Sequence, residues 1–549
     1  MNKETQSRFS EIPIVEKQRS KFKRPYSHKT TINAADIVPI YIDEVLPGDT
    51  VSMDMGAIVR MTTPLYPVMD NAYIDYMFFF VPNRLTWEHW QAFWGENEDP
   101  WTQDIEYEVP QLNAPTGGWE KGTIADYFGI PTKIENISVN ALPFRAYCKI
   151  WNDWFRDENL KTCVHINTDE TTQTGANDGD EVIVAQLGAK PLKAAKYHDY
   201  FTSALPSAQK GSPVFLPLGE KAPVIAGEKH EFARGIGLNF QFYNEQQMSE
   251  GYHKAWLNAR SNGDITINGE TATTTGYAQN FSLQPTNLWT DLTEATASTI
   301  NQLRTAFAIQ RFYEAQARSG SRYIEFIKSI FGVTSPDARL QRSEYLGGKR
   351  VPINMDQVLQ TSATDSNSPQ GNTAAYSCTI NADSMFTHSF TEHGILIGIA
   401  VIRTNHTYQQ GIPRMFSRKK WTDYYIPQFA HLSEQAILNK EIYATGTEAD
   451  NEAFGYQEAW ADYRYKNSQV TGAMRSNYEG SLDVWHYADY YTEQPILGSE
   501  WIDETPVNID RTLAVTSALE HQFICDFYFK PIWTRVMPMY SVPGLIDHY

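Results

Sequence analysis

A strict alternation of apolar and polar positions over residues 50–62 is the clearest structural signal in the chain. The polar positions carry Ser52, Asp54 and Arg60, and Ile58 is the exception. A period of two residues is that of a β strand with one face on a hydrophobic core. The side chains expected on the buried face are Val51, Met53, Met55, Ala57, Val59 and Met61.

Three more segments have the pattern of strands. Residues 75–82 (DYMFFFVP) and 393–404 (HGILIGIAVIRT) are apolar on both faces, which predicts strands covered on both sides. Residues 519–530 alternate again and place four side chains on one face: Phe523, Cys525, Phe527 and Phe529. Because these strands lie near both ends of the chain, a single sheet system with large excursions explains them better than tandem domains.

One excursion, residues 298–332, has helical spacing. Ser298 can cap the start of a first helix and Gly320 can end it, and a second short helix follows (SRYIEFIKSIFG). Two other excursions, residues 167–180 and 261–280, are rich in Thr, Asn and Gly and are expected to be exposed tips. The residues that share one face of the two helices are Ile300, Leu303, Phe307 and Gln310, then Tyr323, Ile327 and Ile330.

The composition supports a β-rich protein with long ordered loops. Aromatic residues make up 13% of the 549 residues and charged residues only 20%, with 28 Pro and 33 Gly as punctuation. The four cysteines form no C-x-x-C pair, so neither a zinc site nor a disulfide framework is expected. The start of the chain is polar and basic, and the longest apolar runs are far below the ~20 residues that span a membrane. We therefore expect a soluble protein made in a reducing compartment.

Charge is distributed unevenly along the chain. The formal net charge is −19, from 46 basic and 65 acidic residues, which argues against a nucleic-acid footprint over the whole surface. Residues 1–30 differ, because eight basic and three acidic residues give this segment a net charge of +5. Its apolar residues show no sustained period, which indicates an extended arm rather than a domain.

No motif with catalytic spacing is present. The segment LGGKR, residues 346–350, lacks the first glycine and the Ser or Thr of a phosphate-binding loop. The thirteen histidines form no H-E-x-x-H pattern, and no G-x-S-x-G or G-x-G-x-x-G occurs. Acidic residues beside tryptophan suit a glycosidase, but the sequence cannot show two carboxylates facing one bond. We expect no catalytic residues, no cofactor and no metal.

The segment FGYQEAWADYRYKNSQVTGAMRSNY, residues 454–478, mixes aromatic and charged residues without a clean period. Three interpretations remain open. It is a platform on which nucleic-acid bases stack, a sugar-binding cleft in which Trp460 meets Glu458 and Asp462, or an irregular loop packed on the core or on a neighbouring subunit.

Several long segments identify a family. The chain resembles the major capsid proteins of microviruses, small single-stranded DNA phages, and most closely their gokushovirus branch. The resemblance runs from about residue 20 to the C-terminus and is weakest over 219–290, where gokushoviruses carry an insertion. The segments that carry it are HKTTINAADIVPIYIDEVLPGDT (28–50), TPLYPVMDNAYIDYMFFFVPNRLTW (63–87), LRTAFAIQRFYEAQARSGSRYIEFIKSIFGVTSPDARLQRSEYLGG (303–348), FGYQEAWADYRYK (454–466) and PMYSVPGLIDHY (538–549).

The resemblance implies a mainly β fold, an eight-stranded antiparallel jelly-roll barrel with large loop and helical insertions. Residues 31–549 would form this single capsid domain behind the basic arm, and 219–290 would form a protrusion at each three-fold axis that meets the host. Sixty copies would build a T=1 icosahedral capsid around circular single-stranded DNA.

The partners implied are further copies of the chain, the packaged DNA, a small basic DNA-binding protein, a minor or pilot protein and a host surface receptor, with no membrane. The location implied is the virion, assembled in the cytoplasm of a bacterial host. Two other classes remain as alternatives, a single-stranded DNA-binding protein without a shell and a carbohydrate-active enzyme.

Two groups of residues follow as candidates for binding. The basic arm and the aromatic segment supply candidates for DNA contact, since Lys and Arg neutralise phosphates and aromatic rings stack on bases. These are Lys17, Arg19, Lys21, Lys23, Arg24, Tyr463, Arg464, Tyr465 and Lys466. The candidates for a host-facing loop are Asn262, Thr266, Asn268, Thr273, Thr274 and Tyr277.

Overall fold

The computed structural model describes residues 18–96, 107–212, 214, 300–362, 364 and 369–541, together with the backbone of short strands between 224 and 290. The chain divides into two compact units. One contains residues 1–210 and 314–549, and the other contains residues 211–313.

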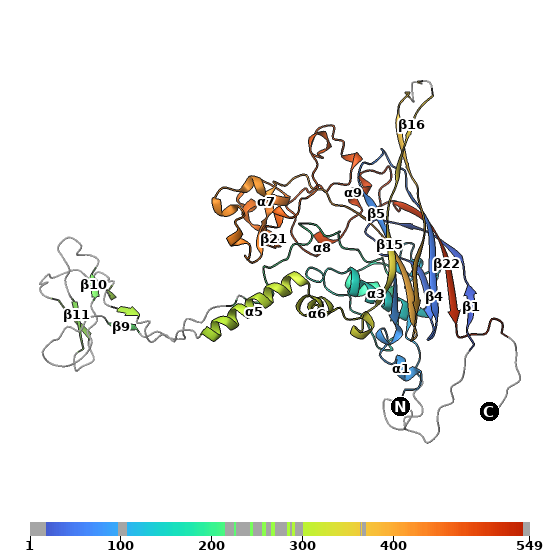
Figure 1. Ribbon diagram of the computed structural model, residues 1–549, viewed down its shortest axis with the longest axis horizontal. Coiled ribbons are helices and arrows are strands. Elements are labelled where there is room, and N and C mark those ends of the chain that lie inside the picture. The colour runs from blue at the N-terminus through green and yellow to red at the C-terminus, as the bar shows by residue number, and fades with distance from the viewer. Residues whose placement is uncertain are drawn as a thin grey trace, which may run out of the picture. The chain divides into compact units, whose positions relative to one another are not determined.

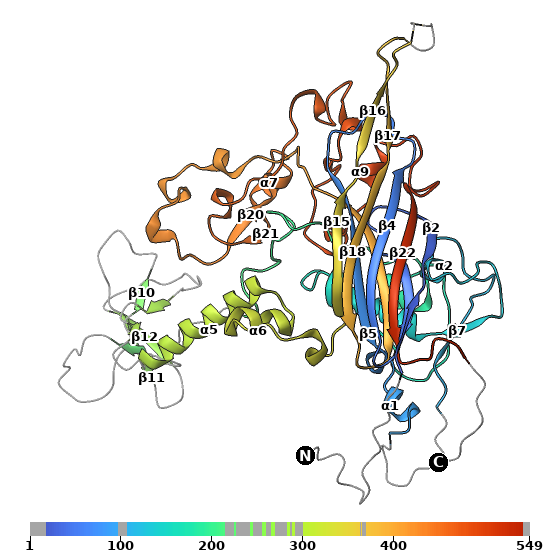
Figure 2. The ribbon, with the colours of Figure 1, turned by 45° about the vertical axis from the view of Figure 1, so that its right-hand side comes forward.

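The first sheet of the larger unit brings the two ends of the chain together. Its order is β18-β4-β22, and β1 and β2 lie one after the other along the free edge of β22, with every pairing antiparallel. Figure 2 shows this layer with β2, β22, β4 and β18 side by side. The strands are β1 (Ser20–Lys23), β2 (Tyr26–Ile32), β4 (Thr50–Met61), β18 (Thr379–Ser389) and β22 (Phe523–Arg535).

The second sheet lies against the first and is also antiparallel, in the order β15-β5-β19-β3 (Figure 1). Its strands are β3 (Val38–Val45), β5 (Ala72–Pro82), β15 (Glu344–Pro352) and β19 (Gly394–Thr404). The four strands predicted from the sequence are therefore confirmed as β4, β5, β19 and β22, although β22 begins at Phe523 and continues to Arg535.

The order in which the chain visits the two sheets is that of a jelly roll. From β2 to β5 it alternates between them, β5 and β15 are paired in the second sheet, and β18, β19 and β22 alternate again. Counting β1 and β2 as one edge, each sheet has four strand positions, which confirms the predicted mainly β jelly roll. The described strands of this jelly roll form two separate hydrogen-bonded sheets and not a closed barrel.

The main core lies between the facing sheets. The alternating positions of β4 point inward, and Val51, Met53 and Val59 have no exposed surface, while Ile58 stays 41% exposed on the outer face. Phe523, Cys525, Phe527 and Phe529 of β22 are buried in the same core. Each predicted inward face is confirmed.

The second sheet is covered on its other face as well. Phe79 and Val81 of β5 and Ile397 of β19 pack in a second core with side chains of α3 (Leu142–Ile150). This cover explains why β5 and β19 are apolar on both faces, as the sequence indicated.

Two long insertions carry most of the remaining structure. The central insertion, residues 83–343, lies between β5 and β15, and the C-terminal insertion, residues 405–522, lies between β19 and β22. A hairpin, β16 (Met355–Leu359) and β17 (Thr373–Ser377), stands between β15 and β18. In the larger unit the central insertion contains α1 (Trp90–Phe93), β6 (Gln111–Asn113), α2 (Ile124–Tyr127), β7 (Ser138–Asn140), α3, β8 (Gln173–Thr174), α4 (Glu181–Val184) and α6 (Tyr323–Phe331). The C-terminal insertion contains β20 (Gln435–Leu438), α7 (Asn439–Ile442), β21 (Ala453–Gln457), α8 (Ser499–Ile502) and α9 (Val507–Asp510).

The predicted helices are present. α5 spans Ile300–Ser319 and α6 spans Tyr323–Phe331, and Gly320 and Gly332, both with positive φ, follow their ends. Ser298 lies outside the described residues. On α6, Tyr323 and Ile330 are 66% and 40% exposed, so much of the predicted apolar face is uncovered in the single chain. Residues 167–180 are mostly exposed or half-buried, as expected, although β8 ties them to β6.

The smaller unit contains short paired strands. Four of them form a sheet in the order β12-β11-β10-β13, and β14 pairs with β9. Their bounds are β9 (Val224–Ala226), β10 (Phe242–Asn244), β11 (Ala255–Ala259), β12 (Ile265–Gly269), β13 (Leu283–Pro285) and β14 (Leu288–Thr290).

The N-terminal segment differs from the expected arm. Residues 20–32 form β1 and β2 and belong to the first sheet, so the boundary predicted at residue 30 falls inside β2. The sequence did not reveal this pairing because the partner strand is distant; Lys29, for example, is 497 residues from Asp526, which lies opposite it.

Candidate functional site

Two of the predicted DNA-contact residues have partners within the fold. The guanidinium of Arg19 donates hydrogen bonds to Thr50 Oγ1 at 3.0 Å and to the carbonyl of Gly48. Arg24 forms an ion pair with Asp43 at 2.6 Å and lies over the ring of Trp533. Lys17 lies outside the described residues.

Lys21 and Lys23 are different, because the alternation of β1 turns both side chains to the outer face of the first sheet. They lie opposite Thr534 and Ile532 of β22 and are exposed. Neither forms an ion pair with a carboxylate of the residues that the structure describes. Their charges are thus available to a partner.

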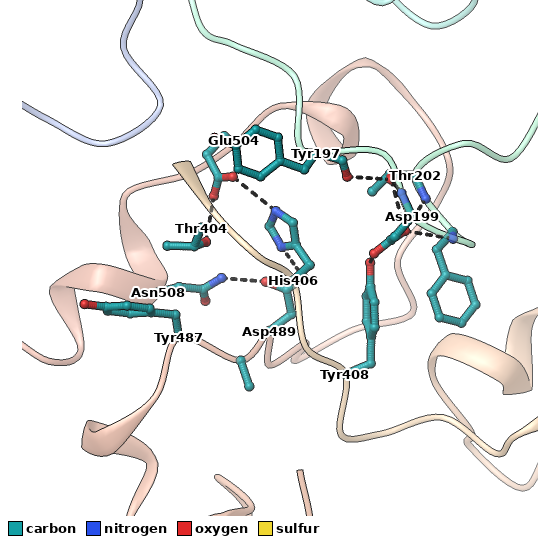
Figure 3. Close-up of polar contacts among 12 residues, drawn as sticks. Tyr197, Asp199, Thr202, Thr404, His406, Tyr408, Tyr487, Asp489, Glu504 and Asn508 are labelled. Atoms are coloured by element: carbon teal, nitrogen blue, oxygen red, sulfur yellow. Dashed lines mark hydrogen bonds and ion pairs between the residues drawn. The ribbon is translucent and has the colours of Figure 1, made fainter. Parts of the chain in front are cut away.

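A buried charged cluster fastens the C-terminal insertion to the end of β19. His406, with a side chain only 1% exposed, donates from Nδ1 to Asp489 at 2.9 Å and from Nε2 to Glu504 at 3.1 Å (Figure 3). Asn508 of α9 donates to the second oxygen of Asp489, and Thr404 donates to Glu504. One imidazolium is therefore placed between two carboxylates.

The cluster is strongly polarised. Burial opposes a charge on His406, but the two carboxylates outweigh it and raise its pKa from the ordinary 6.5 to about 10. Burial would likewise raise the pKa of Asp489, but His406 and Lys196 hold it well below its ordinary value. His406 is thus charged and both ion pairs are formed at neutral pH.

A second polar cluster ties the central insertion to the C-terminal one. Asp199 accepts hydrogen bonds from the backbone of Phe201 and Thr202 at 2.9 and 2.8 Å, and from the hydroxyl of Tyr408 at 2.6 Å (Figure 3). The two insertions also share a small hydrophobic core. It is made by Tyr200, Phe201, Ala204, Tyr408, Ile437, Ile442, Phe454 and Ala461.

The segment 454–478 packs on this small core and not on the two sheets. β21 pairs with β20, and Phe454 is buried beside Phe201. Trp460, in the left-handed conformation with φ of 66°, is buried and donates from Nε1 to the carbonyl of Phe429 at 2.9 Å. The segment is therefore an ordered loop, as one of the three interpretations proposed, and it is supported by the small core that the central and C-terminal insertions share.

Tyr463, Arg464, Tyr465 and Lys466 come together at the wall of a pocket of about 810 Å³. Tyr463 and Tyr465 are about half exposed, and Arg418 lies 4.4 Å from the ring centre of Tyr463. The lining from the rest of the C-terminal insertion includes Gln409, Pro413, Arg414, Met415, Phe416, Glu441 and Arg475.

Most cations of this pocket already have partners. Arg464 pairs with Glu458 at 2.8 Å, Arg418 pairs with Asp462, and Arg414 pairs with Glu441 at 3.3 Å. These pairs also remove the basis of the sugar-cleft interpretation, because Glu458 and Asp462 are held by arginines and Trp460 is buried.

The two predicted DNA-contact groups are not brought together. β22 lies in the right-hand part of the paired sheets, and the part of the C-terminal insertion around α7 and β21 lies to their left, in both views (Figures 1 and 2). β1 is paired with β22. Of the candidates for a host-facing loop, Thr266 and Asn268 lie in β12, and Asn262, Thr273, Thr274 and Tyr277 lie outside the described residues.

Metal-ligating side chains, the cysteines and the LGGKR glycines are the other groups that the sequence singled out. Within the described ranges, no group of His, Cys, Asp and Glu side chains is arranged to hold a metal ion, and no helix there is long and apolar enough to cross a membrane. The four cysteines are free thiols. The glycines of LGGKR lie in β15, where a side chain at Gly348 would collide with the carbonyl of Tyr76. This close approach, and not phosphate binding, accounts for that motif.

Sequence reasoning missed the residues that hold the insertions. His406 is 83 residues from Asp489 and 98 from Glu504, so no local pattern joins them. The available signal was a lone histidine two residues after a largely apolar strand, a place where a charged side chain needs buried partners.

Two packed sheets in jelly-roll order, with large ordered insertions and exposed aromatic side chains, suit a structural protein that assembles with other copies. Comparison with known proteins identifies the family of this structural protein. The family described as "Capsid protein (F protein)" matches residues 10–545. The chain belongs to this capsid protein family and is a structural component of a virion.

Three relatives are similar over nearly the whole chain. Capsid protein VP1 of Bdellovibrio phage phiMH2K is 42% identical, and the alignment covers 100% of this chain and 99% of that protein. Capsid protein VP1 of Spiroplasma virus 4 is 43% identical over 96% of this chain and 95% of its own. Capsid protein VP1 of Chlamydia phage 1 is 39% identical over 98% of both chains. The predicted resemblance to microvirus capsid proteins is confirmed.

Proposed function

We propose that 60 copies of the chain assemble into a T=1 icosahedral capsid that encloses circular single-stranded DNA. The observation that carries the proposal is the complete jelly-roll strand order in a chain that matches the capsid family from residue 10 to residue 545. Assembly takes place in the cytoplasm of a bacterial host. A single-particle reconstruction tests the copy number and the symmetry.

Contacts between copies need large surfaces with aromatic side chains at their centres. The C-terminal insertion offers such a surface beside the pocket, where Met415, Phe416 and Trp421 are 60%, 71% and 69% exposed. Leaving these side chains in water is unfavourable. We assign this surface, with the exposed Tyr463 and Tyr465, to contact with a neighbouring copy.

The packaged DNA needs cations, because its phosphates are confined. The basic residues near the N-terminus supply only a small share of the charge even in 60 copies. A small basic DNA-binding protein, polyamines or metal ions supply the remainder, and a minor or pilot protein completes the particle.

Residues 219–290 are assigned to contact with a host surface receptor. This range lies within the separate compact unit of residues 211–313, whose strands pair among themselves. An element with its own sheet can vary without disturbing the strands that form the shell. The Thr, Asn and Gly side chains of 261–280 suit an exposed surface.

Replacing residues 270–280 by a Gly/Ser linker of equal length tests this assignment. The change is confined to 270–280 because β12 occupies Ile265–Gly269. Particles should form with normal DNA content, while adsorption to the host should fall by about ten-fold or more, equivalent to about 1.4 kcal/mol of binding free energy. Adsorption is measured as the fraction of particles that remain unbound after mixing with cells.

The matched control is a Gly/Ser linker of equal length in place of residues 361–368, between β16 and β17 in the sequence, which should leave adsorption unchanged. Equal loss of adsorption in both variants, or normal adsorption in the first, would contradict a receptor role. Failure of the first variant to assemble would place this loop in a contact between copies.

A further inference from the structure

Among the residues that the structure describes, no layer covers the outer face of the first sheet. The second sheet is covered by α3 on its outer side, but within the described residues the outward side chains of β4 and β22 remain mostly exposed or half-buried. The face defined by the outward positions of β1, β2, β22, β4 and β18 is called the outer sheet face below (Figure 2).

This face is basic although the chain is acidic. Its charged side chains are five cations against two anions, in a chain with a net charge of −19. Lys29 and Asp526 pair at 3.4 Å. Lys530 lies opposite Asp54 in the strand register, but no ion pair joins Lys530, Lys21 or Lys23 to a described carboxylate. The cations are Lys21, Lys23, Lys29, Arg60 and Lys530, and the anions are Asp54 and Asp526.

An aromatic ring stands at the centre of the face among small residues. Strand register places Tyr528, Gly56 and Ala382 in one row across three strands, and Ser27 continues the row on β2. Tyr528 is 42% exposed, and the ammonium of Lys530 lies 5.3 Å from its ring centre.

The backbone conformation at Gly56 does not require a glycine. Its φ is not positive, and an added Cβ would meet only the carbonyl of Asn381 at 3.6 Å, an ordinary contact. The small residues Gly56 and Ala382 therefore leave a shallow space beside the ring of Tyr528, with a cation next to it.

We propose that the outer sheet face binds the packaged single-stranded DNA. Tyr528 stacks on a base in the space left by Gly56, and Lys21, Lys23 and Lys530 contact phosphates on either side. Aromatic stacking beside cations accepts every base, so one face repeated in all copies suits a genome of any sequence. This inference rests on the proposed function, because it names the surface of the capsid that faces the DNA.

Charge complementarity favours DNA over a second copy of the chain as the occupant. A second copy is acidic overall, but its 65 acidic residues are mixed with 46 basic ones, whereas a single DNA strand carries a negative charge at every phosphate. The apolar side chains near the other end of the face, Ile58 and Ile380, lie directly opposite each other and offer further area for bases.

The first test uses the full-length chain and a short oligothymidylate over a series of salt concentrations. Each phosphate contact on a single strand contributes about 0.7 to the slope of log K against log salt, so replacing Lys21, Lys23 and Lys530 by Ser should lower the slope by about 2. The control replaces three exposed lysines of the two insertions, Lys328, Lys419 and Lys420, by Ser and should leave the slope unchanged.

The second test removes the ring. Tyr528→Leu should weaken oligothymidylate binding by roughly ten-fold, within the range measured for stacking on aromatic side chains. Tyr376→Leu, at an exposed tyrosine of β17, is the control and should have no effect. In filled particles, ultraviolet cross-linking should join DNA to the peptide that contains Tyr528.

Three outcomes overturn the inference. The first is a salt-dependence slope for the lysine variant equal to that of its control. The second is a folded lysine variant that forms no shells, which would mean that the face joins two copies of the chain. The third is wild-type particles that contain no DNA, which refutes the proposed function as well. Filled wild-type particles with an unchanged slope in the lysine variant refute this inference alone.

Discussion

Replacing His406 by leucine is expected to destabilise the folded chain by about 3–5 kcal/mol, because two buried carboxylates lose the charge that compensates them. Asp489 and Glu504 both accept a hydrogen bond from this imidazole and are themselves buried. Denaturant unfolding of the unassembled chain measures the loss. Adding Asp489→Asn to His406→Leu should recover part of it, since one of the uncompensated charges disappears.

The same cluster predicts how stability depends on pH. The pKa of His406 is raised to about 10 in the folded chain from 6.5, so its contribution is complete below about 6.5 and is lost as the pH rises through 10. The pKa of Asp489 is lowered, so its contribution is complete above its ordinary value of 3.8 and is lost as the pH falls further. Wild-type stability should therefore decline above pH 6.5, and His406→Leu should lack this decline.

His431→Leu is the matched control, because His431 is an exposed histidine of the same insertion. It should unfold within about 0.5 kcal/mol of the wild type, as surface changes usually do. A His406→Leu chain as stable as this control, or with the same alkaline decline as the wild type, would show that the imidazolium does not hold the C-terminal insertion.

The second large effect is expected at the centre of the main core. Phe527→Ala should cost about 3–5 kcal/mol, the loss typical of removing a buried phenylalanine side chain. Phe527 has no exposed surface and packs edge-on against Tyr76 of the opposite sheet, with ring centres 6.0 Å apart. The loss should appear as less soluble protein and a lower unfolding midpoint, with host choice unchanged.

The adjacent residue gives the control. Tyr528 is one position along the same strand and points to the outer face, so Tyr528→Ala should change the free energy of unfolding far less. If the two alanine variants were equally stable, the alternation of β22 between core and solvent would be wrong.

The strands could be predicted because their information is local. The alternation from Val51 to Met61, and the four inward side chains of β22, follow from a two-residue period that any strand with one buried face must have. The continuous apolar pattern of β5 likewise revealed cover on both faces. The strand order could not be obtained this way, since nothing in β4 says that β22, more than 450 residues later, lies beside it; the family resemblance supplied that step.

The site was predictable in its composition but not in its geometry. Excess positive charge near the N-terminus was visible, yet only strand register shows that Lys21 and Lys23 face outward while Arg24 turns to Asp43. The aromatic segment was visible too, yet the pairing of Arg464 with Glu458 depends on how the loop folds. For Tyr528 the sequence pattern indicates only a place in a strand, because the residues around its ring come from β4 and β18.

A single-particle reconstruction of purified particles tests the central claim most directly. The account predicts a closed shell of 60 equivalent jelly-roll subunits with single-stranded DNA inside, and with the outer sheet face turned toward that DNA. Particles of another symmetry, or a purified chain that forms no closed shell under conditions in which it is folded, would contradict it.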